Sequence, residues 1–128
     1  MCHLTEMPFS AAVLMPKEAE PRFQAKYGGL GLRFPYYSSN ACDVLRPGQD
    51  KALGFQLLLR HIGVEADACV SVGDGNNDIG ILEAAGLSFC VEDGTLDALT
   101  AADRVCPSSG DCGVAAVCRM VWPEAFDI

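Results

Sequence analysis

Short apolar runs alternate with polar and glycine-containing stretches in the first third of the chain. The apolar residues 9–15 predict a buried strand. Pro16 and the glutamates after it favour the first turn of a helix, which Gly28 and its neighbour should end. Residues 32–39 and 42–45 predict two short strands, with a turn at the serines and asparagine between them. The expected order is therefore strand, helix, strand, strand.

Helical and continuously apolar patterns alternate in the rest of the chain. Apolar residues at helical spacing predict a helix over 52–62, which Gly63 ends. The run 68–72 is typical of a strand that is covered on both faces. The next predicted elements are a helix over 79–86, a strand over 87–91, a helix over 96–102, a strand over 104–106 and a helix over 114–121. This alternation predicts parallel strands joined by crossover helices, with a domain boundary near residues 46–48.

The hexapeptide 73–78, Gly-Asp-Gly-Asn-Asn-Asp, joins a predicted buried strand to a predicted helix. The carboxyl ends of parallel strands are where α/β folds hold their functional groups. Asp74 and Asp78 offer hard oxygen ligands, which suit magnesium, and the start of a helix offers backbone donors to an anion. A helix cap needs one Asp or Asn, whereas four of these six positions carry one. The pattern therefore favours a functional site over a capped turn.

The hexapeptide matches two other ligand-binding motifs less well. In a calcium EF-hand that starts at the first aspartate, Ile79 would stand where the loop needs glycine, and Ala85 where it needs glutamate. The spacing of Gly73, Gly75 and Gly80 also departs from the dinucleotide-binding fingerprint.

Composition and charge limit the classes of molecule that the chain is expected to bind. The formal net charge is -8, and basic residues do not cluster, so we expect no nucleic-acid partner. An acidic chain that handles phosphate needs a metal ion or a placed lysine. Seven cysteines occur without a Cys-x-x-Cys pair, which disfavours a zinc site and favours a reducing cytoplasmic location. The apolar run 9–15 is too short to cross a membrane, so we expect no membrane partner.

Several motifs resemble those of one enzyme superfamily. The hexapeptide and the segment after it resemble the last acidic motif of the haloacid dehalogenase superfamily, and are most similar to the Gly-Asp-x-x-Asn-Asp pattern of its Cof-type phosphatases. The matching segments are the lysine motif at 48–53, the acidic motif at 73–78 with its continuation at 81–86, and the closing segments at 101–105 and 111–115. The resemblance covers about residues 42–121 and keeps the order and spacing of the motifs.

The resemblance implies a fold and a domain organisation. It implies an α/β protein with a Rossmann-like, parallel, three-layer α/β/α core, preceded by the end of an α+β cap domain. Residues 1–46 would be the C-terminal remnant of the cap, and residues 47–128 the C-terminal part of the core. The core's first strands would then be missing, and the strand 68–73 would have an open edge that favours self-association.

The resemblance also implies an activity, a magnesium-dependent phosphohydrolase that acts on a small phosphorylated metabolite. Asp74 and Asp78 would bind Mg²⁺, and Asn77 would help to position phosphate. Lys51 would bind phosphate and balance the charge of the carboxylates.

The family's nucleophilic aspartate has no counterpart, because no Asp-x-Asp occurs in the chain. Residues 91–96 resemble that motif only from its second aspartate onward, and Val91 stands where the nucleophile should be. We therefore expect a turn at Asp93 and an inactive chain. The alternative is a non-catalytic magnesium- or phosphate-binding module, or a regulatory interaction module. A phospho-acceptor signalling domain is less favoured, because Lys51 precedes the acidic motif instead of following it.

Overall fold

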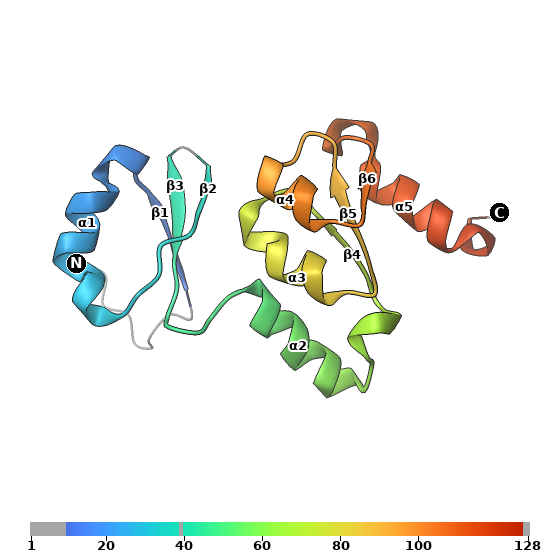
Figure 1. The fold of residues 1–128 in the computed structure, drawn as a ribbon, viewed down its shortest axis with the longest axis horizontal. Coiled ribbons are helices and arrows are strands. Elements are labelled where there is room, and N and C mark those ends of the chain that lie inside the picture. Colours follow the sequence, from blue (N-terminus) through green and yellow to red (C-terminus); the bar gives the residue numbers. More distant parts are fainter. Residues whose placement is uncertain (1–9, 39, 127–128) are drawn as a thin grey trace. The chain divides into compact units, whose positions relative to one another are not determined.

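The computed structural model describes residues 10–38 and 40–126, so residue 9 of the first predicted strand and residue 39 of the predicted turn lie outside it. The chain divides into two compact units, Met1–Asp50 and Lys51–Ile128 (Figure 1). Among the described residues, no helix has the length and apolar character needed to cross a membrane.

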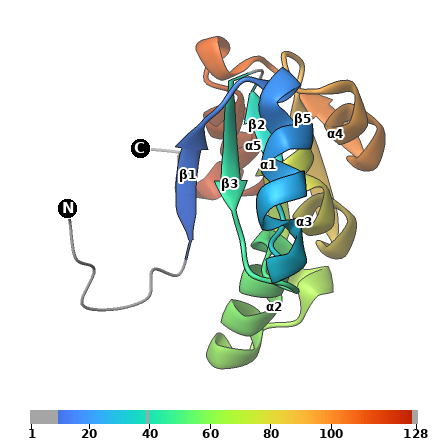
Figure 2. The same cartoon turned by 90° about the vertical axis from the view of Figure 1, so that its left-hand side faces the viewer.

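The first unit is a small antiparallel sheet with one helix. Its elements are β1 (Ala11–Leu14), α1 (Glu20–Tyr27), β2 (Tyr36–Ser38) and β3 (Ala41–Val44). The strands pair in the order β1-β3-β2, and α1 lies along one face of the sheet (Figures 1 and 2). Phe23 of α1 packs edge-on against Phe34, with the ring centroids 4.9 Å apart. The predicted order of strand, helix, strand, strand is confirmed, while the assignment of this region to a cap domain stays a prediction.

The predicted strand over 32–39 is shorter in the structure. Arg33 forms only an isolated bridge with Leu45, and regular pairing resumes at Tyr36. Pro35 lies between the two paired segments and has no backbone N–H to contribute to the ladder. The proline therefore limits β2 to the residues that follow it.

The second unit alternates helices and parallel strands, as the apolar pattern predicts. Its elements are α2 (Lys51–Ile62), β4 (Val70–Gly73), α3 (Ile79–Ala84), β5 (Leu87–Val91), α4 (Leu96–Ala101), β6 (Arg104–Cys106) and α5 (Gly113–Val121). The strands pair in the order β4-β5-β6, all parallel. The first of them begins later than predicted, because Ala66–Ala68 forms a 3₁₀ turn closed by a hydrogen bond from Cys69 N to Ala66 O.

Helices cover both faces of this sheet. On one face, Phe89 and Val91 of β5 pack with Val117 of α5. On the other face, Cys90 packs with Leu82 of α3 and with a buried alanine of α4. Because successive side chains of a strand point to opposite faces, β5 contributes to both cores. The predicted α/β fold with a three-layer, parallel core is confirmed.

Strand β4 lies at the edge of the sheet. Among the described residues it pairs with β5 alone. Ser71 of β4 is 7% exposed, and its hydroxyl oxygen has no hydrogen-bond partner within the described part of the chain. The second edge of β4 therefore offers unpaired backbone groups beside a buried, unsatisfied hydroxyl group.

Candidate functional site

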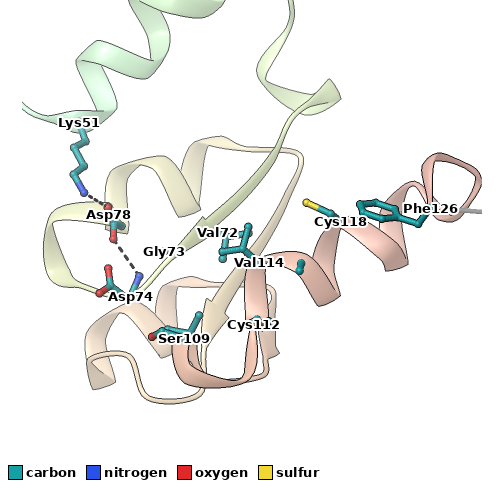
Figure 3. A pocket seen from close by; sticks show the side chains of 13 residues that line it. Lys51, Val72, Gly73, Asp74, Asp78, Ser109, Cys112, Val114, Cys118 and Phe126 are labelled. Carbon is teal, nitrogen blue, oxygen red and sulfur yellow. Dashed lines mark hydrogen bonds and ion pairs between the residues drawn. The ribbon is translucent and has the colours of Figure 1, made fainter. Parts of the chain in front are cut away.

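A pocket of about 760 Å³ opens where β4 ends. Three of the four residues selected from the sequence, Lys51, Asp74 and Asp78, line it together (Figure 3). The other lining residues are Val72, Gly73, Val91, Ser109, Cys112, Gly113, Val114, Ala115, Cys118 and Phe126. The pocket thus has a charged end at the acidic loop and a mostly apolar wall from β4 and α5.

Asp78 connects the lysine of the site to the acidic loop. Its Oδ1 accepts a hydrogen bond from Lys51 Nζ at 2.5 Å. Its Oδ2 accepts hydrogen bonds from Asp74 N at 3.1 Å and from Gly75 N at 3.3 Å. Figure 3 shows this carboxylate between the ammonium group and the acidic loop. Asp78 is 7% exposed, so it holds the loop and the lysine from a largely buried position.

The two carboxylates of the site have opposite pKa shifts. Burial alone would raise the pKa of Asp78, but the hydrogen bonds from Lys51 and from the Asp74 amide outweigh it, and the pKa is lowered. The pKa of Asp74 is raised, chiefly because its side chain shares a hydrogen bond with Asp78 and also because of burial. Asp78 is therefore held as the anion, while Asp74 gains from a proton or a cation placed beside it.

The position of Lys51 depends on the packing of α2 against α3. Lys51 is the first residue of α2, and Gly80 lies in the first turn of α3. A methyl group added at Gly80 would lie 2.7 Å from the Cβ atom of Ala52, far inside ordinary contact distance. The glycine therefore allows the two helices to approach closely, and this approach brings the lysine to Asp78.

Asn77, the fourth predicted residue, is placed differently. It is half-buried in the 3₁₀ turn Asn76–Asp78 and is not among the residues that line the pocket. Its Oδ1 lies near the backbone of Gly75, 2.9 Å from where a Cβ atom at that glycine would be. A phosphate-binding role for Asn77 stays a prediction.

Ser109 and Cys112 also line the pocket, and neither was among the predicted site residues. Ser109 follows β6, and its backbone N–H and hydroxyl group both donate to Asp93, the residue predicted to form a turn. Cys112 precedes α5 and has a left-handed backbone, with φ at 59°. The closing segment 111–115 was the available signal for Cys112, but it did not indicate that the thiol reaches this pocket.

The carboxylate oxygens of the site are ligands of the type that Mg²⁺ prefers. Mg²⁺ prefers oxygen ligands and keeps several waters, and one or two carboxylates often hold it together with substrate phosphates. Asp74 is exposed and its pKa is raised, so its carboxylate would gain from an added cation, whereas both oxygens of Asp78 already accept hydrogen bonds. Within the described residues, no group of three or more His, Cys, Asp or Glu side chains could hold a metal ion. The arrangement therefore suits a weakly held, hydrated ion better than a closed metal cage.

The chain is similar in sequence to known proteins. The sequence pattern of haloacid dehalogenase-like hydrolases matches residues 8–117. The chloroplastic endoribonuclease YBEY of Arabidopsis thaliana is 35% identical over 77 residues, which are 60% of this chain and 13% of that protein. A phosphoglycolate phosphatase of Methanospirillum hungatei is 29% identical over 84 residues, which are 66% of this chain and 36% of that protein.

The fold is also similar to that of solved hydrolases. A haloacid dehalogenase-like hydrolase from Bacteroides thetaiotaomicron superposes with a TM-score of 0.78 at 20% identity, over 91% of this chain and 46% of that one. The chain thus spans less than half the length of each of these three proteins. Because the family pattern extends over residues 8–117 of 128, the chain belongs to the haloacid dehalogenase-like hydrolase family.

Proposed function

We propose that the second unit provides the metal- and phosphate-facing part of a phosphohydrolase for small phosphorylated metabolites. The observation that carries this proposal is the joint placement of Lys51, Asp74 and Asp78 in one pocket at the end of a parallel strand. Two carboxylates and one ammonium group leave the site with a net negative charge. A phosphate can enter such a site only when a cation offsets that charge.

In this proposal Lys51, Asp74 and Asp78 have different roles. Mg²⁺, when bound, would neutralise charge that develops on a transferring phosphoryl group. Asp74 would bind the ion, since its carboxylate faces the pocket and has the raised pKa. Asp78 would support the ion from behind, by fixing the acidic loop and by holding the Lys51 ammonium at the rim. Lys51, whose side chain is 50% exposed, would contact the phosphate.

The apolar wall of the pocket is suited to the carbon skeleton of a small organic substrate. Val72, Val114, Cys118 and Phe126 line the end of the pocket away from the carboxylates (Figure 3). A phosphate held at the charged end would direct the carbon skeleton of a metabolite along this wall. The phosphatase name of the Methanospirillum relative supports the same substrate class.

The 128 residues contain no Asp-x-Asp, so the carboxylate that attacks phosphorus in this family has no counterpart in them. We infer that this chain on its own binds Mg²⁺ but does not turn over phosphate esters. The non-catalytic binding module gives the same result for the isolated chain. The two functions differ once an attacking carboxylate is supplied by another polypeptide segment, since only the hydrolase half-site would then show turnover.

Calorimetry with Mg²⁺ tests the proposal on the 128-residue chain. Asp74→Asn should abolish the binding heat, because it removes the charge and one oxygen ligand. The matched control is Asp67→Asn, which neutralises an exposed aspartate of the turn before β4 and should leave binding unchanged. Unchanged affinity in Asp74→Asn would refute the metal role. Magnesium-dependent hydrolysis of an aryl phosphate that Asp74→Asn abolishes would refute the expected inactivity.

We further propose that the open edge of β4 leads to self-association and that the chain resides in the cytoplasm. The edge of β4 that pairs with no described strand supports the first proposal, because its backbone groups can pair with a second chain. The free thiols of Cys42, Cys69, Cys90 and Cys106 support the second. Sedimentation velocity over a concentration series should show a dimer that dissociates on dilution, and a monomer at every concentration would contradict self-association.

A further inference from the structure

The loop after β5 lies directly on the acidic loop after β4. The backbone N–H of Thr95 donates to the carbonyl oxygen of Asp74 at 2.9 Å. A methyl group added at Gly94 would lie 3.0 Å from that oxygen and 2.6 Å from Cys90 Sγ. A residue with a side chain at Gly94 would therefore push the two loops apart. The glycine permits a direct backbone contact between them.

A second contact joins the same two loops through side chains. The Thr95 hydroxyl donates to Asn76 Oδ1 at 2.5 Å. Asn76 in turn donates through Nδ2 to Asp97 Oδ2 at 3.2 Å. Thr95 Oγ1 also accepts a hydrogen bond from Ala98 N at 3.4 Å, so the residue is fixed at the start of α4. The backbone and the hydroxyl group of Thr95 thus hold the acidic loop on either side of Gly75.

These contacts fix the backbone of Asp74 from both directions. Its N–H donates to Asp78 Oδ2 at 3.1 Å, and its C=O accepts from Thr95. The carboxylate itself remains exposed to the pocket. A ligand whose backbone is held in this way loses little conformational freedom when it binds an ion, and its orientation is set before the ion arrives.

We propose that Thr95 is a positioning residue, which orients Asp74 through its own N–H and through the hydroxyl link to Asn76. This inference rests on the proposed metal role of Asp74. Supporting groups that orient a metal ligand typically affect metal affinity by about 10- to 100-fold. Thr95 acts at the backbone of the ligand instead of at its carboxylate, so we expect the lower end of that range.

The experiment measures Mg²⁺ affinity by calorimetry, at a temperature where every variant is folded. Thr95→Val removes the hydroxyl group and should weaken binding by about tenfold. Thr95→Ser keeps the hydroxyl group and the N–H, so it should restore most of the affinity. Thr100→Val is the matched control, because the Thr100 hydroxyl donates to Leu96 O within α4 and to nothing else in the described part of the chain. That variant should bind Mg²⁺ like the parent chain.

Asn76→Ala separates positioning from helix capping. Thr95→Val loses both the Asn76 link and the side-chain cap of α4, so its melting temperature should fall. Asn76→Ala leaves the cap intact and should weaken Mg²⁺ binding to a similar extent with a smaller loss of melting temperature. Because both substitutions remove the same hydrogen bond between Thr95 and Asn76, their combination should weaken Mg²⁺ binding no more than either alone.

The outcomes distinguish this inference from the proposed function. If Asp74→Asn abolishes Mg²⁺ binding while Thr95→Val leaves it unchanged, Thr95 does not position the site and the proposed function stands. An equal loss of affinity in Thr95→Val and Thr100→Val would reduce the effect to general destabilisation and overturn the inference. If Asp74→Asn leaves Mg²⁺ binding unchanged, the proposed function and the inference fail together.

Discussion

Lys51 Nζ lies 2.5 Å from Asp78 Oδ1, although the two residues are 27 positions apart in the chain. The Asp78 side chain is 10% exposed and the Lys51 side chain 50% exposed. A largely buried carboxylate is thus neutralised by an ammonium group that still reaches solvent. The pair therefore joins the start of α2 to the acidic loop and places the Lys51 ammonium group in the pocket lining.

Removing this ammonium group should leave a buried charge without its partner. We expect Lys51→Met to lower the free energy of unfolding by about 1–2 kcal/mol, because the buried Asp78 carboxylate loses its charged donor, while the amides of Asp74 and Gly75 still donate to it. Urea denaturation measures the change. Arg60→Met is the control, since Arg60 lies exposed on the same helix and, among the described residues, donates to Gln56 O alone. A loss in Lys51→Met no larger than in the control would show that the pair adds no stability.

Gly80 should tolerate alanine only when its neighbour becomes smaller. Gly80→Ala gains up to about 1 kcal/mol of helix propensity, but overpacking against Ala52 costs about 1–3 kcal/mol. We therefore expect a net loss of stability and weaker Mg²⁺ binding, because α2 carries Lys51. Adding Ala52→Gly relieves the 2.7 Å contact and should recover part of both losses. If the double variant is no better than the single one, helix approach is not the cause.

Asp103 should contribute stability that depends on pH. The Ser88 N–H and hydroxyl group donate to Asp103 Oδ2 at 2.9 Å each, and these bonds lower the pKa of Asp103. Since an unfolded aspartate has a pKa of about 3.9, the contribution is complete above about pH 4 and is lost as pH falls through the folded-state pKa. The stability difference between the parent chain and Asp103→Asn should therefore shrink below about pH 4. Denaturation curves measured from neutral to acidic pH test this, and a difference that stays constant would contradict it.

Cys112 should be a site where glycine is stabilising. Its left-handed backbone costs a residue with a side chain about 1–2 kcal/mol, whereas glycine gives up about 0.5–1 kcal/mol in chain entropy. Cys112→Gly should therefore raise the melting temperature slightly. Cys112→Ala keeps the unfavourable backbone and serves as the comparison. An equal rise in both variants would trace the gain to loss of the exposed thiol instead of to the backbone.

The sequence predicts the strands of the second unit well where local signals agree. For β5 and β6 the predicted bounds are those observed, because apolar runs there end at turn-forming residues such as Gly86 and Pro107. The start of β4 was predicted two residues early, because Ala68 is apolar and gives no sign of the 3₁₀ turn to which it belongs. Hydrophobic pattern therefore locates strands better than it locates their first residues.

The candidate site was predictable only in part. Lys51, Asp74 and Asp78 share a pocket because β4, α2 and α3 bring them together, and their motifs were visible in the sequence. Asn77 belongs to the same loop but does not line the pocket, and residue identity alone does not indicate which side chains of a loop face a pocket. The bond from Thr95 to Asn76 joins residues 19 positions apart, and no periodic pattern encodes such a contact.

The position of β4 at the sheet margin has a consequence for how the pocket could be completed. Neighbouring parallel strands have their carboxyl ends on the same side of a sheet. Any strand that docked beside Val70–Gly73 in the parallel sense would therefore direct its last residues toward the mouth where Asp74 stands. Docking of such a strand would therefore place its last residues next to Asp74, where the proposed ion would lie.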